Sequence, residues 1–242
     1  MSKHHHAPSK MSSAFSIQPC THADLPVLTD IWRDSFANDP FLHARWPESQ
    51  VGPATLHAHV KNAFSKYLDS PHTQSWKMVD TSTGTVAGWT HWGMPHTLTE
   101  EEKEKERLEK EKEQREKEEG KSKFPAGSNI EICEWKSAGW ERMREKWYQK
   151  EDISLILQLV VYFITVSPSY QRRGVGNLLL SHGLAWADAA GQKTYLEATV
   201  AGRPLYKKLG FKEVDVMEKD LGEELGIGRN WAMIRQPIAK DP

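Results

Sequence analysis

Residues 155–166, Leu-Ile-Leu-Gln-Leu-Val-Val-Tyr-Phe-Ile-Thr-Val, form the most apolar run of this 242-residue chain. The run is rich in β-branched and aromatic side chains and has almost no polar alternation, which is typical of a strand covered on both faces. Such strands occur in sheets with helices packed against them. The sequence therefore predicts an α/β fold of the α+β type with residues 155–166 as a central strand.

Other segments show the periodicities of shorter strands and of amphipathic helices. Strands are expected at residues 14–19, 76–79, 86–92, 193–199, 211–217 and 231–234. Helices are expected from about residue 21 to 39, from about 56 to 69, and at 174–190 and 203–209. We interpret residues 13–242 as one domain and residues 1–12, which contain three consecutive histidines, as a flexible tail.

The stretch 99–123 differs from the rest of the chain because it consists almost entirely of Glu, Lys and Arg, with Leu108 as its only large apolar residue before Phe124. Three Glu-before-Lys pairs at i,i+4 favour a helix. Thr99 with Glu102 fits a capping box, and Gly120 fits a helix stop. The composition favours a solvated helix or a partly disordered insertion over a partner-binding arm, and its mixed charge signs argue against binding to nucleic acid.

The following segment, 130–148, is amphipathic and rich in tryptophan. It is expected to return the chain to the domain as a helix, either over the substrate side or as surface packing. Together the two segments form a charged insertion at about 99–150.

The overall composition excludes several classes of function. Thirty-two basic and 33 acidic residues give a net charge of -1, so no global field attracts nucleic acid or an anionic membrane. Cys20 and Cys133 are too few for a disulfide framework and lack metal-site spacing, and no bound metal is expected. No apolar run reaches the length of a membrane span and no signal peptide is visible, so the protein is expected to be cytoplasmic.

The sequence Gln-Arg-Arg-Gly-Val-Gly at residues 171–176 lies between the central strand and the helix 174–190. Its glycines allow a ligand to approach the backbone, and the first turn of a helix has amides without internal partners. These amides and the helix dipole suit a pyrophosphate, with Arg172 and Arg173 adding charge at the rim. The loop lacks the third glycine of a dinucleotide fingerprint and the ending of a P-loop.

A second motif, Leu-Tyr-Lys-Lys-Leu-Gly-Phe at residues 205–211, combines a short helix with the start of a strand. Together the two motifs resemble the GNAT superfamily of acyl-CoA-dependent N-acyltransferases, whose phosphate-loop pattern residues 171–176 match in full. The resemblance implies a mixed sheet of about six to seven strands, splayed between strands 4 and 5, with the charged insertion between strands 3 and 4. Acetyl-CoA would bind in the splay, with the backbone of Ile164, Thr165 and Val166 along its pantetheine arm. The phosphate loop with the amides that bind its pyrophosphate would be Gln171, Arg172, Arg173, Gly174, Val175, Gly176 and Asn177.

Tyr206 matches the position where many members of this family keep a tyrosine near the departing thiolate. A phenol with a pKa of about 10 is protonated at neutral pH and can donate a proton there, although its ring could equally pack in the core. Glu197 is the best candidate for the base that deprotonates the amine, with an ordinary strand carboxylate as the alternative. His91 is the second candidate for this base.

Aromatic side chains near the expected acceptor pocket could favour an apolar or cationic amine, or could simply be core: Trp32, Phe36, Trp89, Trp92 and Tyr162. The leading hypothesis is transfer of an acetyl group to the primary amine of a small molecule by direct attack, in a monomer or homodimer. The alternatives are acetylation of a protein lysine or N-terminus, and a non-catalytic acyl-CoA sensor.

Overall fold

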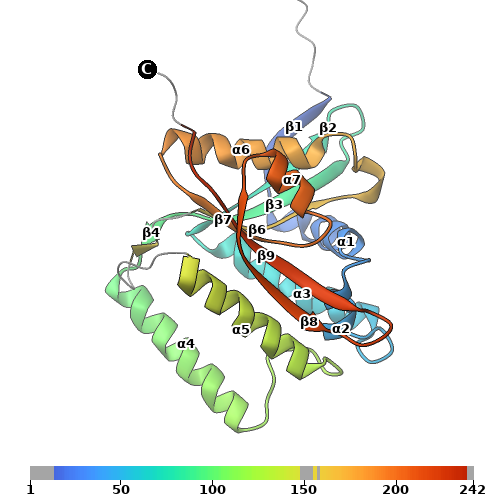
Figure 1. Cartoon of the computed structure of the whole chain (residues 1–242), viewed down its shortest axis with the longest axis vertical. Coiled ribbons are helices and arrows are strands. Elements are labelled where there is room, and N and C mark those ends of the chain that lie inside the picture. The colour runs from blue at the N-terminus through green and yellow to red at the C-terminus, as the bar shows by residue number, and fades with distance from the viewer. Residues whose placement is uncertain (1–13, 148–154, 157–158, 239–242) are drawn as a thin grey trace, which may run out of the picture.

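A seven-stranded mixed sheet forms the centre of the protein (Figure 1). The structure is a computed structural model that describes residues 14–147, 155–156 and 159–238. The strand order is β1-β2-β3-β6-β7-β9-β8, in which β6 and β7 are parallel and the other neighbours are antiparallel. The strands are β1 (Phe15–Pro19), β2 (Thr73–Asp80), β3 (Val86–Gly93), β6 (Leu159–Val166), β7 (Thr194–Ala198), β8 (Lys212–Asp220) and β9 (Ile227–Arg235).

Helices cover both faces of this sheet. They are α1 (Leu25–Ser35), α2 (Pro40–Arg45), α3 (Pro53–Asp69), α4 (Glu100–Glu118), α5 (Ile130–Trp147), α6 (Val175–Ala189) and α7 (Arg203–Lys208), with 3-10 turns η1 (His22–Asp24) and η2 (Pro168–Tyr170). Helices α1 and α3 pack around the buried Trp89 on one face, and α6 packs on the other against Met78 and Ala87. Gly183 lets α6 approach the sheet closely, because a Cβ atom there would lie 2.3 Å from Trp92 Cζ2.

The expected splay lies between β6 and β7, the fourth and fifth strands of the large sheet. Their pairing ends where Val161 meets Leu196, whereas β6 continues to Val166 and β7 to Ala198. Asn230 on β9 donates from Nδ2 to the carbonyl oxygen of Ala198 at 3.1 Å. The prediction of a mixed, splayed sheet flanked by helices is confirmed.

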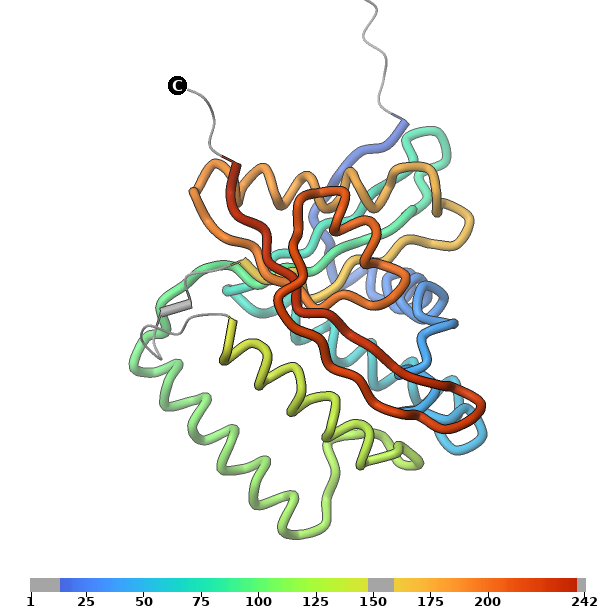
Figure 2. The backbone as a smooth tube through the Cα atoms, viewed as in Figure 1, coloured from blue at the N-terminus to red at the C-terminus, as the bar shows by residue number. Residues whose placement is uncertain are grey.

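The charged insertion forms a helical hairpin, α4 followed by α5, beside the main sheet (Figure 1). Helix α4 has no buried residue, and Lys117 at its end pairs with Glu134 on α5 at 2.9 Å. Helix α5 packs against the sheet through Met143, which lies with Tyr195 and Met217 in one cluster. Figure 2 shows the β8–β9 hairpin extending beside α5 toward α2, and α5 contacts both β8 and α2.

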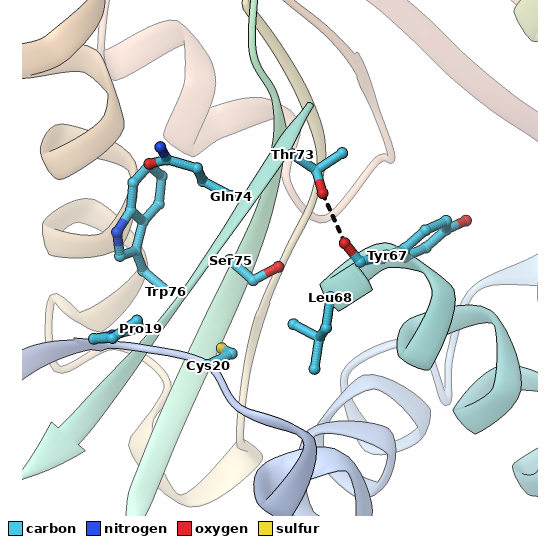
Figure 3. A pocket seen from close by; sticks show the side chains of 8 residues that line it. All are labelled: Pro19, Cys20, Tyr67, Leu68, Thr73, Gln74, Ser75 and Trp76. Atoms are coloured by element: carbon cyan, nitrogen blue, oxygen red, sulfur yellow. Dashed lines mark hydrogen bonds between the residues drawn. The ribbon is translucent and has the colours of Figure 1, made fainter. Parts of the chain in front are cut away.

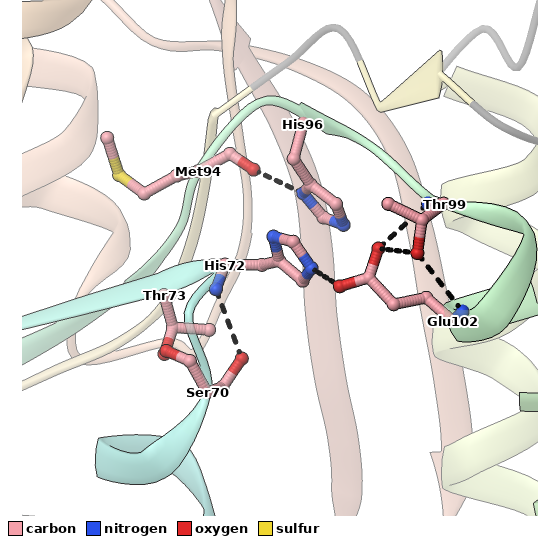
Figure 4. Close-up of polar contacts among 7 residues, drawn as sticks. All are labelled: Ser70, His72, Thr73, Met94, His96, Thr99 and Glu102. Atoms are coloured by element: carbon pink, nitrogen blue, oxygen red, sulfur yellow. Dashed lines mark hydrogen bonds and ion pairs between the residues drawn. The ribbon is translucent and has the colours of Figure 1, made fainter. Parts of the chain in front are cut away.

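The start of α4 is held by a polar cluster at the start of β2 (Figure 4). The predicted capping box is present, with Glu102 N donating to Thr99 Oγ1 at 3.2 Å and Thr99 N donating to Glu102 Oε2 at 2.8 Å. The other carboxylate oxygen of Glu102 lies 2.5 Å from His72 Nε2, and the His72 ring stacks on His96 with centroids 3.8 Å apart. Thus α4 is solvated along its length but attached to the domain at its first turn.

Several expected boundaries differ from the structure. The run 155–166 divides into β5 (Leu155–Ile156), which pairs with β4 (His96–Thr97) in a separate ribbon, and β6. Helix α2 was not predicted, because six residues between two prolines carry no helical period, and β9 begins four positions before the expected residue 231. The predicted tail, 1–12, lies outside the described residues. Among the residues that the structure describes, no helix is both long enough and apolar enough to cross a bilayer.

Candidate active site

The splay opens into a cavity of about 1690 Å³. Its walls come from the end of α1, from α2 and α3, from insertion helix α5, from β6 and the loop before α6, and from the segment between β7 and α7. It therefore connects the predicted phosphate loop to the region of Glu197 and Tyr206.

At one end of the cavity lies the N-terminus of α6. Gly174 is the N-cap residue and has a left-handed backbone with φ of 84°, and Arg172 also has a positive φ of 62°. A left-handed residue followed by helical ones turns successive amides to one side, which makes an anion-binding concavity. A Cβ atom at Gly174 would meet no atom within 4 Å, so the space in front of this backbone is open.

Most of the predicted acetyl-CoA residues line this cavity: Ile164, Val166, Gln171, Arg172, Gly174, Val175, Gly176 and Asn177. Two do not. Thr165 is 1% exposed and donates from Oγ1 to the carbonyl oxygen of Trp89 at 3.4 Å, because alternate residues of β6 face opposite sides. Arg173 instead pairs with Asp80 at 3.6 Å and lies over the Tyr170 ring, so its charge points away from the cavity rim expected for it.

Tyr206 lies on α7, between the cavity and the core. Its ring packs edge-to-face on Phe211 with centroids 5.9 Å apart, and it is 6% exposed although it lines the cavity. Gly202 makes room for this ring, since a Cβ atom there would lie 2.8 Å from Tyr206 Cε2. Burial raises the pKa of Tyr206, so its phenol keeps its proton at and well above neutral pH.

Glu197 points from β7 into the cavity and is held by Arg144 of α5. The guanidinium binds both carboxylate oxygens, with Nε to Oε1 at 2.7 Å and Nη2 to Oε2 at 3.0 Å. The Glu197 side chain is 5% exposed and that of Arg144 is 35% exposed. This carboxylate is therefore buried and paired with an arginine from the insertion.

His91 does not line the cavity. It is 1% exposed, its Nδ1 lies 2.8 Å from Ser75 Oγ, and its ring stacks on Tyr67 with centroids 4.6 Å apart. Burial lowers the pKa of His91 to about 3, so the ring stays neutral. The second candidate for the base is a packed core histidine.

The five predicted acceptor-pocket aromatics divide into two groups. Trp32, Phe36 and Tyr162 line the cavity. Trp89 and Trp92 are both 0% exposed and lie in the core, where Trp89 donates from Nε1 to the carbonyl oxygen of Leu28 at 3.0 Å. The structure therefore corrects the placement of these two tryptophans, which pack α1, α3 and α6 onto β3.

Sequence reasoning missed several residues on the opposite wall. Helix α2 contributes Phe41 and Arg45, and α5 contributes Lys136 and Trp140 along with Arg144. The tryptophan-rich amphipathic pattern of 130–148 allowed either a helix over the substrate side or surface packing, and Trp140 of this helix lines the cavity. Trp135 instead stacks on Phe41 with centroids 5.8 Å apart and packs with Trp147 in a neighbouring cluster.

Neither cysteine is placed as a nucleophile. Cys20 lines a separate, smaller cavity of about 220 Å³ between β1, β2 and the end of α3, where Thr73 Oγ1 donates to the carbonyl oxygen of Tyr67 (Figure 3). Burial and the nearby Asp24 raise the pKa of Cys20 to about 12, so it is a thiol and not a thiolate. Cys133 is fully buried, and the described residues contain no cluster of three or more potential metal ligands.

Comparison with known proteins identifies the family. Residues 132–213, which run from α5 through the phosphate loop to β8, match the model of the acetyltransferase (GNAT) domain. The chain carries a GNAT acetyltransferase domain. It is therefore an acyltransferase, and its fold implies acetyl-CoA as co-substrate.

Solved structures with this GNAT fold span almost the whole chain. A Corynebacterium glutamicum structure described as histone acetyltransferase HPA2 and related acetyltransferase has TM-score 0.56 and 21% identity, covering 95% of this chain and all of that one. Arylalkylamine N-acetyltransferase 2 from Aedes aegypti has TM-score 0.60 and 14% identity over 93% of this chain and 99% of that one. The ribosomal-protein-S18-alanine N-acetyltransferase of Escherichia coli has TM-score 0.52 and 16% identity over 94% and 96%. No curated protein matches the chain in sequence.

Proposed function

We propose that this GNAT domain transfers an acetyl group from acetyl-CoA to the primary amine of a small molecule, by direct attack within a ternary complex. The observation that carries the proposal is the single cavity that joins the amides at the start of α6 to Tyr206 and Glu197. One cavity that reaches both a pyrophosphate site and an acid and base pair suits a reaction between two ligands bound at once.

The chain's own residues fit acetyl-CoA. The amides of residues 174–177 bind the pyrophosphate, with the dipole of the 15-residue helix α6 behind them. The backbone of β6 between Tyr162 and Val166, beyond its pairing with β7, takes the pantetheine arm as an added strand. Bound there, acetyl-CoA supplies an activated thioester.

Two side chains handle the protons. Tyr206 donates its phenolic proton to the leaving thiolate, a role supported by its position in the cavity wall and by burial that keeps the phenol neutral. Glu197 accepts the proton of the attacking amine. Arg144 fixes the orientation of its carboxylate, which has lone pairs left for a further hydrogen bond.

The walls of the acceptor end favour a small molecule over a protein. Helices α2 and α5 line this part of the cavity with the large side chains Phe41, Lys136 and Trp140, of which Phe41 and Lys136 are almost fully buried. An acetyltransferase for lysine side chains or N-termini needs an open groove for the polypeptide on both sides of the amine. A sensor would bind acetyl-CoA without turning it over.

The test is acetyl-CoA turnover with a mixed library of amines and peptides, followed by thiol release and product mass. We expect release above the buffer rate with at least one small amine and not with peptides. Release with peptides alone would replace the proposal by a protein acetyltransferase, and tight acetyl-CoA binding without release would indicate a sensor.

The cofactor site is tested by Gly174→Asp against Gly174→Asn. Both side chains tolerate a left-handed backbone better than most and have nearly the same shape, but only Asp places a negative charge against the pyrophosphate. We expect Gly174→Asp to weaken acetyl-CoA binding about tenfold or more relative to Gly174→Asn, because the carboxylate repels the pyrophosphate and competes with it for the positive end of the helix dipole. Equal affinities of the two variants would show that the pyrophosphate binds elsewhere.

A further inference from the structure

Lys136 is a buried lysine in the wall of the acceptor end of the cavity. It is 6% exposed, and no carboxylate of the described residues forms an ion pair or hydrogen bond with its ammonium group. Its contacts are aromatic: Nζ lies 4.2 Å from the ring centroid of Phe41 and 5.0 Å from that of Trp140. A buried charge without an opposite charge is costly, so such lysines usually serve a ligand or titrate.

Arg45 is a second cation in the same wall. Its guanidinium carbon lies 4.1 Å from the Trp46 ring and 5.8 Å from the Trp140 ring, and its Nε has no hydrogen-bond partner among the described residues. Both cations, Arg45 and Lys136, therefore lie near the ring of Trp140. Together these three residues form one cationic patch in the cavity wall.

The other charges of the cavity do not neutralise this patch. Arg144 and Glu197 neutralise each other in their two-point ion pair. Asp39 is the nearest acidic side chain of α2, and its Oδ1 is used to cap that helix through the amides of Phe41 and Leu42. Asp34, Glu141 and Glu145 also line the cavity, and none of them forms an ion pair with Lys136 or Arg45 among the described residues; Asp34 pairs with Arg33. The buried Lys136 and the half-buried Arg45 therefore have no carboxylate partner in this part of the chain.

We infer that the acceptor is an amine that also carries an anionic group, a carboxylate or a group of the same charge, which binds between Lys136 and Arg45. The inference rests on the proposed function, because it describes the molecule that supplies the amine. The aromatic rings of Phe41 and Trp140 hold the two cations in place and line the path for the apolar part of the molecule.

The titration of Lys136 follows from the same burial and gives the binding a pH dependence. Burial lowers its pKa to about 7, with Arg45 lowering it further and Asp39, Cys133 and Glu197 opposing the shift. A bound anion favours the charged form and raises this pKa, so anion binding takes up a proton when the lysine is partly neutral. Affinity for the anionic amine should therefore be highest below pH 7 and fall as the pH rises above it.

The experiment compares amines that differ only in the anionic group: phenylalanine with phenylalaninamide, and 4-aminobutanoate with butylamine. Thiol release from acetyl-CoA gives kcat/KM, and tryptophan fluorescence, to which Trp140 contributes, gives binding at pH 6 and pH 8.5. The variants are Lys136→Met, Lys136→Arg and, as a control on the same helix, Lys146→Met, whose lysine lies outside the cavity and pairs with Asp215 at 2.9 Å.

We expect the carboxylate amines to be the better substrates of each pair and to bind more tightly at pH 6 than at pH 8.5. Lys136→Met should lower their kcat/KM at least tenfold without changing the affinity for acetyl-CoA. Lys136→Arg should retain binding but lose its pH dependence, and Lys146→Met should behave as wild type.

The outcomes separate this inference from the proposed function. Faster turnover of the neutral amines, with Lys136→Met unchanged, would overturn the anionic acceptor while leaving acetyl transfer in place. Carboxylate-dependent binding that Lys136→Met abolishes, without any thiol release, would support the anion site and reject acetyl transfer. Fluorescence that shows no difference within either pair would reject the anion site whatever the turnover.

Discussion

Arg144 of insertion helix α5 and Glu197 of β7 form a two-point ion pair, with Nε to Oε1 at 2.7 Å and Nη2 to Oε2 at 3.0 Å. The pair joins a segment of unusual composition to the centre of the sheet, at the wall of the cavity. The insertion is therefore part of the cavity wall, and its removal would expose a buried carboxylate.

Replacing Arg144 by Met should destabilise the protein by about 3 kcal/mol, because it leaves Glu197 buried without its counter-charge. The double variant Arg144→Met with Glu197→Gln should recover a substantial part of this loss, since a neutral amide is less costly to bury than an unpaired carboxylate. Urea unfolding of the two variants measures the difference. The matched control is Arg142→Met, which removes an exposed arginine of the same helix and should leave the unfolding midpoint unchanged.

The same set of variants tests the base. In Glu197→Gln the carboxamide cannot accept a proton, so kcat should fall while acetyl-CoA affinity stays constant. If Glu197 only anchors Arg144, kcat will follow the loss of folded protein and no more. Comparing kcat per folded molecule in Glu197→Gln and Arg144→Met separates these two roles.

Tyr206→Phe keeps the ring packing on Phe211 and removes the phenolic proton. We expect kcat to fall about 10- to 100-fold with unchanged acetyl-CoA affinity, as for loss of a general acid. The sign of the pKa shift adds a second expectation: burial raises the pKa above its usual value of about 10, so the wild-type kcat should show no alkaline loss from Tyr206 below about pH 10. An unchanged kcat in Tyr206→Phe would mean that the ring is only part of the core.

The backbone of the site could be predicted from sequence because it depends on local patterns. The turn before α6 needs a left-handed residue, which glycine provides at position 174, and an apolar strand precedes this turn. The position of the phosphate loop therefore follows from a few neighbouring residues. The seven strands of the sheet could likewise be predicted, because each strand has its own pattern of apolar residues in the sequence.

The acceptor wall could not be predicted in this way, because it depends on packing between distant segments. Arg45 and Lys136 meet at Trp140 only because the insertion folds back onto α2, and neither lies in a motif. Trp89 and Trp92 show the opposite error: β3 is covered by helices on both faces, so each ring packs in the core and neither reaches the cavity.

The attachment of α4 through Glu102 leads to the last prediction (Figure 4). Glu102→Gln preserves the capping box, since Gln also serves at that position, but removes the charge that holds His72. Because α4 has no buried residue, we expect amide exchange of residues 100–118 to accelerate while α6 is unaffected. Glu101→Gln, in the same turn and exposed, is the control for loss of charge at a helix start.

The pH dependence of this attachment has a definite sign. Hydrogen bonds from Thr99 and then His72 lower the pKa of Glu102 to about 2, well below the usual value of about 4.3. A lowered carboxyl pKa stabilises the folded form above the usual value, and this contribution disappears as the pH falls toward 2. The advantage of wild type over Glu102→Gln in the exchange protection of α4, corrected for the intrinsic rate, should therefore still be present at pH 5 and shrink only as the pH falls further toward 2. A difference that has already vanished at pH 5 would show that Glu102 is not what holds the helix.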